Sequence, residues 1–299
     1  MIRTGIDLGG TKIEIIAMDS DDNIVYRQRE ATPQGNYHAT LDTIVALVAT
    51  LENKIAQKTS IGIGTPGAIS QKTGMLKNSN STCLNNQPLK HDLEKRLSRE
   101  IKTSNDANCF ALSEAADGAA AGASSVFGVI IGTGTGAGIV INQKIVEGVN
   151  RIGGEWGHNP LPWPKDDERS RPCYCGQSAC IETFLSGPGL EADFFQHCGQ
   201  KLSAQKIVTL AEQGDTKAEA CLQRYQHRLA RSLATVINIL DPEVIVLGGG
   251  LSNIQRLYNN VPKLWGEFVF SDLVLTKLVA PKFGDSSGVR GAARLWDFS

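Results

Sequence analysis

A strand, a glycine-rich turn and a second strand begin the chain, and the same arrangement returns near its middle. The first copy is RTGIDLGGTKIEIIAMD (3–19), followed by NIVYRQRE, and the second is VFGVIIGTGTGAGIVINQKIVEG (126–148). In both, β-branched and apolar residues flank the glycines, as in antiparallel strands joined by a tight turn. The copies share geometry more than identity. A unit duplicated at the head of each half predicts two related α/β lobes around a cleft.

Between and after these copies, helix and strand patterns alternate. Apolar residues recur at helical spacing over 37–54, and an Ala-rich helix follows a strand and a loop at Asn105–Asp106. The Ala- and Gly-rich run at 115–123 ends that helix and is the candidate crossing between lobes. We expect an N-terminal lobe of residues 1–117 plus about 286–299, and a C-terminal lobe of residues 118–285. The other expected elements are a strand at 60–69 leading into a Pro-Gly loop, helices near 188–198 and 204–213, a long helix over about 216–240, a strand at 243–249, a helix near 251–268 and a last helix that begins near 286.

The composition excludes several classes of protein. Net charge is −1 over 299 residues, and acidic and basic residues are mixed, so no basic stripe indicates binding to nucleic acid or anionic lipid. No uninterrupted apolar stretch approaches the ~20 residues of a membrane span. The N-terminal MIRTGIDLGG places Asp7 and a glycine pair where a signal peptide needs an apolar core. We therefore expect a cytoplasmic protein with reduced thiols.

The two glycine turns, DLGGTK and GTGTGAG, are candidate phosphate loops. Neither matches G-x-x-x-x-G-K-[ST], and both lead into strands, whereas a Rossmann loop opens a helix. What remains is a hairpin tip that exposes backbone N–H groups to a phosphate, with Thr11 and Thr133 adding hydroxyl donors. Asp7, just before the first loop, is suited to hold a hydrated Mg²⁺ against the phosphates. The alternative is two glycine-rich hairpins that bind no ligand. This is disfavoured, because the two loops lie at equivalent places in a duplicated chain.

One stretch, GHNPLPWPKDDERSRPCYCGQSAC, contains His158, Cys173, Cys175 and Cys180. Three thiolates and one imidazole are a standard tetrahedral zinc set, and the charged loop 164–172, which looks solvated, can bring the ends together. In a reducing compartment a disulfide cluster is a weaker alternative, as are idle thiols. Four protein ligands leave no position for water or substrate, so the predicted zinc is structural.

Motifs along essentially the whole chain resemble one family. DLGGTK, SNDAN, GTGTGAG, GGEWGH, CYCGQSACIE and LGGG occur in the order seen in the ROK family of repressors, open reading frames and kinases. The resemblance implies the two-lobed, actin-like (ribonuclease H-like) α/β fold of sugar kinases, with a central cleft. Segments 78–88 and 154–163 and the C-terminal GDSSGVRGAARLW look like the bacterial fructokinases of the family, of the manno(fructo)kinase type. Two departures are Ala179, where the family usually has Gly, and a loop from 158 to 173 that looks longer than in many family glucokinases.

The same resemblance implies roles for individual residues. Asp106 matches the family's catalytic Asp, a general base for the sugar hydroxyl, although composition alone favours a helix cap at Asp106 or Ser104. Glu155 and Glu182 would bind sugar hydroxyls, although composition alone makes them surface acids just as readily. His158 can hold zinc through one ring nitrogen and face the sugar with the other. The implied set is Pro66, Gly67, Asn80, Asn105, Asp106, Glu155, His158 and Glu182 for the sugar; Asp7, Gly9, Gly10, Thr11, Lys12, Gly132, Thr133, Gly134, Gly136 and Gly249 for the nucleotide; and His158, Cys173, Cys175 and Cys180 for zinc.

We therefore expect an ATP-dependent, Mg²⁺-requiring hexose kinase that converts fructose to fructose 6-phosphate. Kinases of N-acetylglucosamine, mannose or glucose are the alternatives, because a few pocket contacts decide between hexoses. A sugar-sensing repressor of the family would carry a helix-turn-helix before the first glycine loop, and Asp7 leaves no room for one. An actin-type scaffold would not need Asn105–Asp106 or the zinc segment. By resemblance we expect a homodimer.

Overall fold

The structure is a computed structural model that describes residues 2–297. It divides into two compact units. Unit 1 comprises Met1–Gly118, Gly138–Gly153 and Asp285–Ser299, and unit 2 comprises Ala119–Ala137 and Gly154–Gly284. The expected division placed residues 138–153 in the C-terminal lobe, whereas their contacts group them with unit 1.

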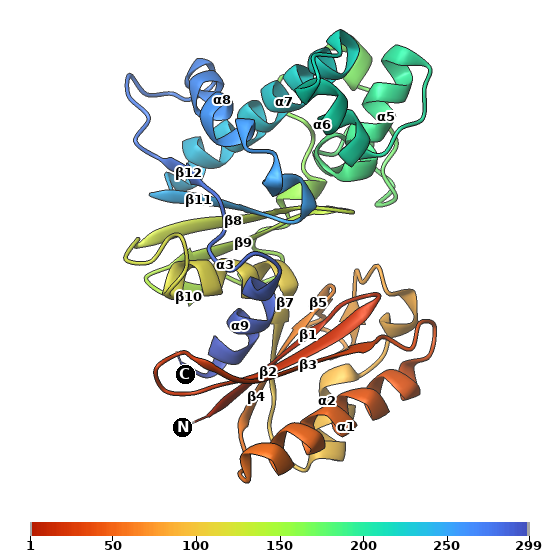
Figure 1. The fold of residues 1–299 in the computed structure, drawn as a ribbon, viewed down its shortest axis with the longest axis vertical. Helices are drawn as coiled ribbons and strands as arrows, with labels where there is room; N and C mark the ends of the chain where they lie inside the picture. Colours follow the sequence, from red (N-terminus) through yellow and green to blue (C-terminus); the bar gives the residue numbers. More distant parts are fainter. Residues whose placement is uncertain (1, 298–299) are drawn as a thin grey trace. The chain divides into compact units, whose positions relative to one another are not determined.

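Unit 1 is built on a five-stranded sheet in the order β3-β2-β1-β4-β7 (Figure 1). Strands β1 and β2 form the predicted hairpin, and β3 extends it antiparallel, whereas β4 and β7 run parallel to β1. Because parallel strands end at the same edge of a sheet, the residues that follow β1, β4 and β7 share one edge. The strands span Arg3–Leu8 (β1), Lys12–Met18 (β2), Ile24–Ala31 (β3), Ser60–Thr65 (β4) and Lys102–Asn105 (β7).

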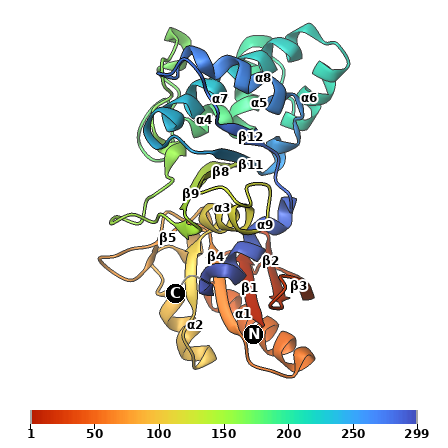
Figure 2. The ribbon, with the colours of Figure 1, turned by 90° about the vertical axis from the view of Figure 1, so that its left-hand side faces the viewer.

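Helices cover both faces of this sheet. Alternation along β2 sends Ile13 and Ile15 into a core with α1 (Tyr37–Ile55) and α2 (Leu89–Leu97). Ile16 and Met18 point to the other face, where they pack on α9 (Ser287–Ala293), which in turn contacts α3 (Asp106–Ala116). Figure 2 shows α1 and α2 on one side of β1 and β4. A small ribbon of β5 (Ala68–Ile69) and β6 (Leu76–Lys77) follows β4.

The second sheet has the order β10-β9-β8-β11-β12. Strands β8, β11 and β12 are parallel, and the boundary between the units passes through β9, after Ala137. Helices α7 and α8 lie over one face of β8 and β11 in both views (Figures 1 and 2). The elements are β8 (Ser125–Ile131), β9 (Thr135–Ile141), β10 (Lys144–Ile145), α4 (Glu182–Leu185), α5 (Gly187–Cys198), α6 (Ala204–Glu212), α7 (Thr216–Leu240), β11 (Val244–Gly248), α8 (Arg256–Leu264) and β12 (Lys277–Val279).

Three local features differ from the expectations. The helix expected near 251–268 is the shorter α8, flanked by 3-10 turns at Gly250–Asn253 and Trp265–Glu267. The loop expected at Asn105–Asp106 is absent, because β7 ends at Asn105 and α3 begins at Asp106. The charged loop 164–172, expected to be solvated, contains a buried carboxylate at Glu168, whose residue is only 2% exposed.

Among the helices formed by residues 2–297, none combines the length and the apolar character that a membrane crossing requires.

Candidate active site and metal centre

The carboxyl ends of β1, β4 and β7 bring most of the predicted unit 1 residues to one edge. Asp7 on β1 pairs with Gly64 on β4, and Asn105 at the end of β7 pairs with Thr65. Pro66 and Gly67 directly follow β4, and Asp106 directly follows β7. The fold therefore explains how residues separated by about a hundred positions form one cluster.

Within this cluster, the carboxylate of Asp7 is buried and close to other negative charges. Burial raises its pKa to about 7, helped by the negative charges of Asp106 and Glu14 and opposed by Lys12 and Arg29. Two carboxylates gathered at one sheet edge repel each other, and a divalent cation with oxygen ligands relieves that repulsion. The charge arrangement therefore fits the Mg²⁺ expected at Asp7.

The N-cap of α3 is Asn105, a residue that the sequence analysis did not expect as a cap. Its Oδ1 accepts a hydrogen bond from the N–H of Ala107 at 2.8 Å. The cap was expected at Asp106 or Ser104; instead Asp106 is the first helical residue and is exposed. The Oδ1 of Asp106 also accepts from Ala107 N, at 2.8 Å. A carboxylate at a helix N-terminus interacts favourably with the helix dipole.

The first glycine loop is a tight hairpin tip whose carbonyl groups are already bonded. Gly9 N donates to Lys12 O at 3.0 Å and closes the turn. Thr32 donates to the carbonyls of Gly9 (through Oγ1, 2.8 Å) and Thr11 (through N, 3.0 Å). Because the carbonyls are engaged, the loop offers N–H groups and the exposed Thr11 hydroxyl to an anion, as a phosphate loop requires.

Asn80 lies on a segment that is fixed next to this loop. Asn85 accepts from Ser79 N and donates to Ser79 O, both at 2.8 Å, and so clamps the backbone before Asn80. A Cβ at Gly10 would lie 3.3 Å from Ser81 Oγ, which places the segment beside the loop tip. Asn80 itself is exposed.

The carboxyl ends of β8 and β11 form a second edge, in unit 2. The loop Gly132–Gly136 follows β8 and Gly249 follows β11, whose Gly248 pairs with Ile130. Gly249 has a φ of +81°, and a Cβ there would lie 2.5 Å from Ile131 O, so the backbone tolerates only glycine. Beside this edge is a pocket of about 690 Å³, lined by Gly132, Thr133, Gly187, Pro188, Glu191, Ala204, Gln205, Val208, Thr209, Gly250, Leu251, Asn253 and Ile254.

Most of this pocket was not predicted from the sequence. Only Gly132 and Thr133 of its lining belong to the expected nucleotide set, and the remaining wall comes from α5, α6 and the turn after β11. These residues are chemically ordinary and have no characteristic spacing, so no sequence signal identifies them.

Glu182 connects the second glycine loop to the zinc segment. Its Oε2 accepts a hydrogen bond from Thr135 N at 2.9 Å. A Cβ at Gly134 would lie 2.7 Å from the same oxygen, so the carboxylate can approach only because residue 134 is glycine. The hydroxyl of Thr135 is buried and, among the described residues, has no hydrogen-bond partner.

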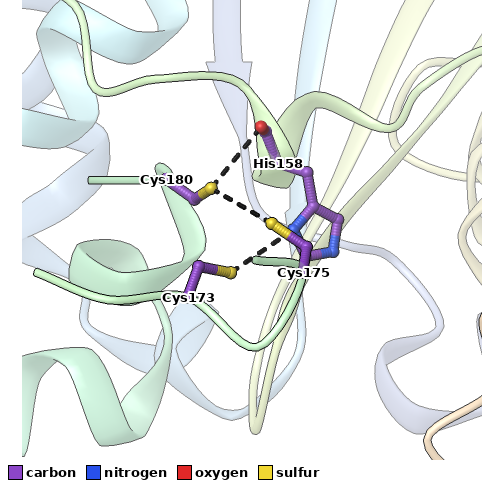
Figure 3. Close-up of side chains that lie close together, drawn as sticks. All are labelled: His158, Cys173, Cys175 and Cys180. Carbon is purple, nitrogen blue, oxygen red and sulfur yellow. Dashed lines mark hydrogen bonds between the residues drawn. The ribbon is translucent and has the colours of Figure 1, made fainter. Parts of the chain in front are cut away.

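The expected metal ligands lie together in unit 2 (Figure 3). One ligand atom each from His158, Cys173, Cys175 and Cys180 lies within 4.8 Å of the others. Cys173 Sγ is 3.7 Å from His158 Nδ1, and Cys175 Sγ is 3.6 Å from Cys180 Sγ. Tetrahedral zinc with metal–sulfur bonds of about 2.3 Å separates its ligands by about 3.8 Å. The residues therefore fit a structural zinc ion.

The thiol chemistry agrees with this fit. All the cysteines are free, and 3.6 Å between Cys175 and Cys180 is far beyond the ~2.05 Å of a disulfide bond. The backbone N–H of Gln177 lowers the pKa of the exposed Cys175 thiol to about 7. Burial raises the pKa of Cys173 and raises that of Cys180 to about 12, so a bound zinc ion would have to displace their protons.

The second ring nitrogen of His158 has a partner that sequence reasoning missed. Nε2 lies 3.0 Å from the hydroxyl of Tyr174, and the two rings meet edge to face. This nitrogen was expected to face the sugar. Trp156 is buried, packs edge to face on Phe127 and donates to Ser232 O at 3.2 Å. It anchors the segment that carries Glu155 and His158.

A buried ion network holds the loop between His158 and Cys173. Glu168 accepts from Arg228 Nε at 2.6 Å and from Arg231 Nη2 at 2.9 Å, and Arg228 also donates to Asp193 at 2.6 Å. Burial alone would raise the pKa of Glu168, but the bonds from Arg228, Lys165 N and Arg231 lower it to about 2. The loop is therefore tied to α5 and α7 instead of being solvated.

Comparison with known proteins agrees with this architecture. The sequence model of the ROK family matches residues 3–298. The chain is 40% identical over 296 residues to an N-acetyl-D-glucosamine kinase of Photobacterium profundum, covering 97% of this chain and 98% of that one. The crystal structure of a ROK hexokinase from Thermus thermophilus has a TM-score of 0.87 at 27% identity, covering 98% of this chain and 97% of that one. A ROK family glucokinase from Streptomyces griseus, solved with glucose and AMPPNP, has a TM-score of 0.80 at 25% identity, covering 99% of both chains.

The expected two-sheet α/β fold of the actin-like sugar kinases is thus confirmed. Because the family match spans nearly the whole sequence and the relatives are kinases of sugars, this chain belongs to the ROK family and is one of its sugar kinases.

Proposed function

We propose that this sugar kinase transfers the γ-phosphoryl group of ATP to the 6-hydroxyl of a hexose, with Asp106 as the general base. The observation that carries the proposal is the clustering of Asp106 and Asp7 at one sheet edge beside a glycine loop. Phosphoryl transfer needs an oriented hydroxyl, an acceptor for its proton and neutralised phosphate charge. The exposed carboxylate of Asp106 supplies the acceptor, and Mg²⁺ bound near Asp7 would neutralise phosphate charge.

In this reaction the hexose oxygen forms a bond to the γ-phosphorus while the bond to the β–γ bridging oxygen breaks. The hydroxyl proton passes to Asp106 and then to solvent. In unit 2, the N–H groups of loop 132–136 hold phosphate oxygens and the 690 Å³ pocket receives the adenosine part. In unit 1, the N–H groups of loop 9–12 are suited to bind a phosphate as well. Glu182 uses Oε2 for Thr135 N and presents Oε1 to a sugar hydroxyl.

For the acceptor we propose N-acetylglucosamine, because the relative named above is an N-acetyl-D-glucosamine kinase over nearly its full length. Fructose, expected from the sequence, is the second candidate, because segments 78–88 and 154–163 resemble fructokinases of the family. Identity of 40% does not decide between them, since a few pocket contacts change the preferred hexose.

A coupled assay of ADP release with ATP and a panel of hexoses decides the acceptor. N-acetylglucosamine should give a higher kcat/KM than fructose, mannose or glucose. A higher value for fructose would replace the first candidate by the second, and no turnover with any hexose would refute the kinase proposal itself.

Asp106→Asn tests the base within the same assay. It should keep the fold and hexose binding but lower kcat by at least ~100-fold, because the amide cannot accept the proton. Asp42→Asn, an exposed carboxylate of α1, serves as the control and should keep full activity. Near-normal turnover of a folded Asp106→Asn protein would refute the base assignment.

A further inference from the structure

A buried carboxylate lies beside Asp7 and has no role in the reaction described so far. Glu14 on β2 is only 1% exposed and is paired with Asp7 on β1. On its other side, Glu14 is paired with Arg29 on β3. Residues directly opposite one another in antiparallel strands point to the same face of the sheet, so Asp7, Glu14 and Arg29 form one row across three strands. At the backbone, Arg29 therefore lies about 10 Å from Asp7, the spacing of two strands.

Two guanidinium groups bind this one carboxylate. Arg29 Nε donates to Glu14 Oε2 at 2.8 Å, and Arg27 Nε lies 2.6 Å from Glu14 Oε1. A buried ion pair contributes little net stability compared with apolar side chains, and Ile16 and Met18 fill buried places on the same face. One arginine would be enough to neutralise Glu14. The second leaves an excess of positive charge beside it, which favours an anion.

The two arginines differ in what else they bind. Arg27 also donates from Nη2 to Ser286 Oγ at 3.0 Å. Among the described residues, the guanidinium of Arg29 donates only through Nε, and 42% of its side chain is exposed. Its two Nη groups, the free edge of Arg29, are therefore available to a ligand. A guanidinium that is held at one end and free along the other edge can bind two oxygens of one phosphate.

Arg29 also lies close to the first glycine loop. Two residues further along β3, Ala31 is paired with Lys12 at the end of the loop. Thr32 then donates to two carbonyl groups of the loop, so the end of β3 is bonded to it. Because side chains alternate along a strand, Lys12 points to the same face of the sheet as Glu14. The phosphate-binding loop, Lys12 and Arg29 are thus neighbours within unit 1.

We propose that Arg29 binds the phosphoryl group that the kinase transfers, through its Nη groups. This inference rests on the proposed function, because the phosphoryl group comes either from the γ-position of ATP or from the 6-phosphate of the hexose product. Both sources present terminal phosphate oxygens that accept hydrogen bonds from a guanidinium. The ion pair with Glu14 already limits the orientations of Arg29, so less conformational freedom is lost when a phosphate binds.

Arg29→Gln and Arg27→Gln form a matched pair of variants. Each removes one of the two cations that bind Glu14 and leaves the other, so both proteins should fold and should lose similar thermal stability. In equilibrium titrations, Arg29→Gln should bind AMPPNP, the hexose 6-phosphate or both about tenfold more weakly or worse, as for a lost charge-assisted hydrogen bond. Affinity for ADP, which lacks the γ-phosphate, and for the unphosphorylated hexose should not change. Arg27→Gln should keep all four affinities at wild-type values.

The ligands separate the possible outcomes. A loss confined to AMPPNP supports the site and assigns it to the nucleotide, whereas a loss confined to the hexose 6-phosphate supports it and assigns it to the product. Unchanged affinity for both in Arg29→Gln would overturn the proposal. An equal loss in Arg27→Gln would also overturn it, because the effect would then come from the ion pair with Glu14. If the wild-type protein phosphorylates no hexose, the kinase proposal fails, and titration of both variants with AMPPNP and ADP still decides the role of Arg29.

Discussion

At the scale of single residues, Ala179 shows how the metal loop constrains the backbone. It precedes Cys180, is buried, and has a φ of +57°, in the left-handed region that favours glycine. The sequence marked this position because the family usually has glycine there, and the structure confirms that the backbone needs a positive φ. An alanine in this conformation costs about 1 kcal/mol relative to glycine, which the zinc loop tolerates.

The effect of substituting Ala179 on stability and zinc content should therefore depend on whether the new side chain is branched at Cβ. Ala179→Val should destabilise the protein by at least ~2 kcal/mol and lower its zinc content, because a β-branched residue is strained at positive φ and the site is buried. Ala179→Gly should keep zinc and stability near the wild type, since relief of strain offsets the greater freedom of the unfolded chain. Thermal unfolding and metal analysis check both variants, and a Val variant with wild-type zinc and melting temperature would refute the strain argument.

At the scale of elements, the sequence predicts long periodic segments well and short or long-range features poorly. The helices at α1 and α7 were expected within a residue or so of their ends, because many buried residues recur at helical spacing. Helix α2 was not expected, since only Leu89 and Leu93 of its nine mostly polar residues are buried. The burial of Glu168 could not be predicted either, because its partner Arg228 is 60 positions away.

The candidate site likewise contains some features that the sequence predicts and others that it does not. Residue chemistry and spacing predicted the zinc ligands, since a Cys₃His set needs few further constraints. The pocket wall at Val208 and Ile254 and the contact of Tyr174 with His158 depend on which elements the fold brings together, and residue types alone do not predict this.

The zinc ion should stabilise the segment from His158 to Cys180, which contains its ligands. Metal analysis should find about one zinc per chain, and Cys175→Ser should lower zinc content and melting temperature together, because binding and local folding are coupled. Activity should fall as well, since Glu155 and Glu182 flank the site in sequence, and added Mg²⁺ should not restore it, because thiolates bind hard cations poorly. Cys198→Ser, outside the cluster, is the control. A metal-free protein with full activity would refute the zinc assignment.

The buried ion pairs of Glu168 predict that the stability of the protein depends on pH. The folded pKa of Glu168, about 2, lies below its ordinary value of 4.5, so its stabilisation is complete above about pH 4.5 and is lost as pH falls toward 2. Glu168→Gln should lower stability by ~3 kcal/mol at pH 7, because Arg231 loses its buried counter-charge and Arg228 keeps only that of Asp193. Denaturant unfolding should show the difference from wild type shrinking below pH 4, while exposed Asp166→Asn stays near wild type. A difference that does not vary with pH would contradict the network.

At the scale of the whole molecule, the proposed tasks are distributed over two units. Unit 1 contains Asp7 and Asp106, whereas every residue that lines the 690 Å³ pocket belongs to unit 2. Unit 2 also contains the complete metal cluster. If the pocket receives the adenosine part of ATP, nucleotide affinity should be separable by mutation from proton transfer and from zinc binding.

Val208 on α6 offers the sharpest test of this separation, because it lines the pocket and is absent from both other clusters. Val208→Glu replaces an apolar side chain of the pocket by a carboxylate and should raise KM for ATP about tenfold or more, since a charge with no partner is costly to desolvate beside the bound base. KM for the hexose and zinc content should remain at wild-type values, and Val208→Ile, which keeps this side chain apolar, should leave all three unchanged. Asp106→Asn should show the opposite pattern, with ADP affinity unchanged by equilibrium titration and kcat lost. An unaltered KM for ATP in a folded Val208→Glu protein would place the nucleotide elsewhere, because a carboxylate introduced into the pocket that binds the nucleotide should weaken that binding.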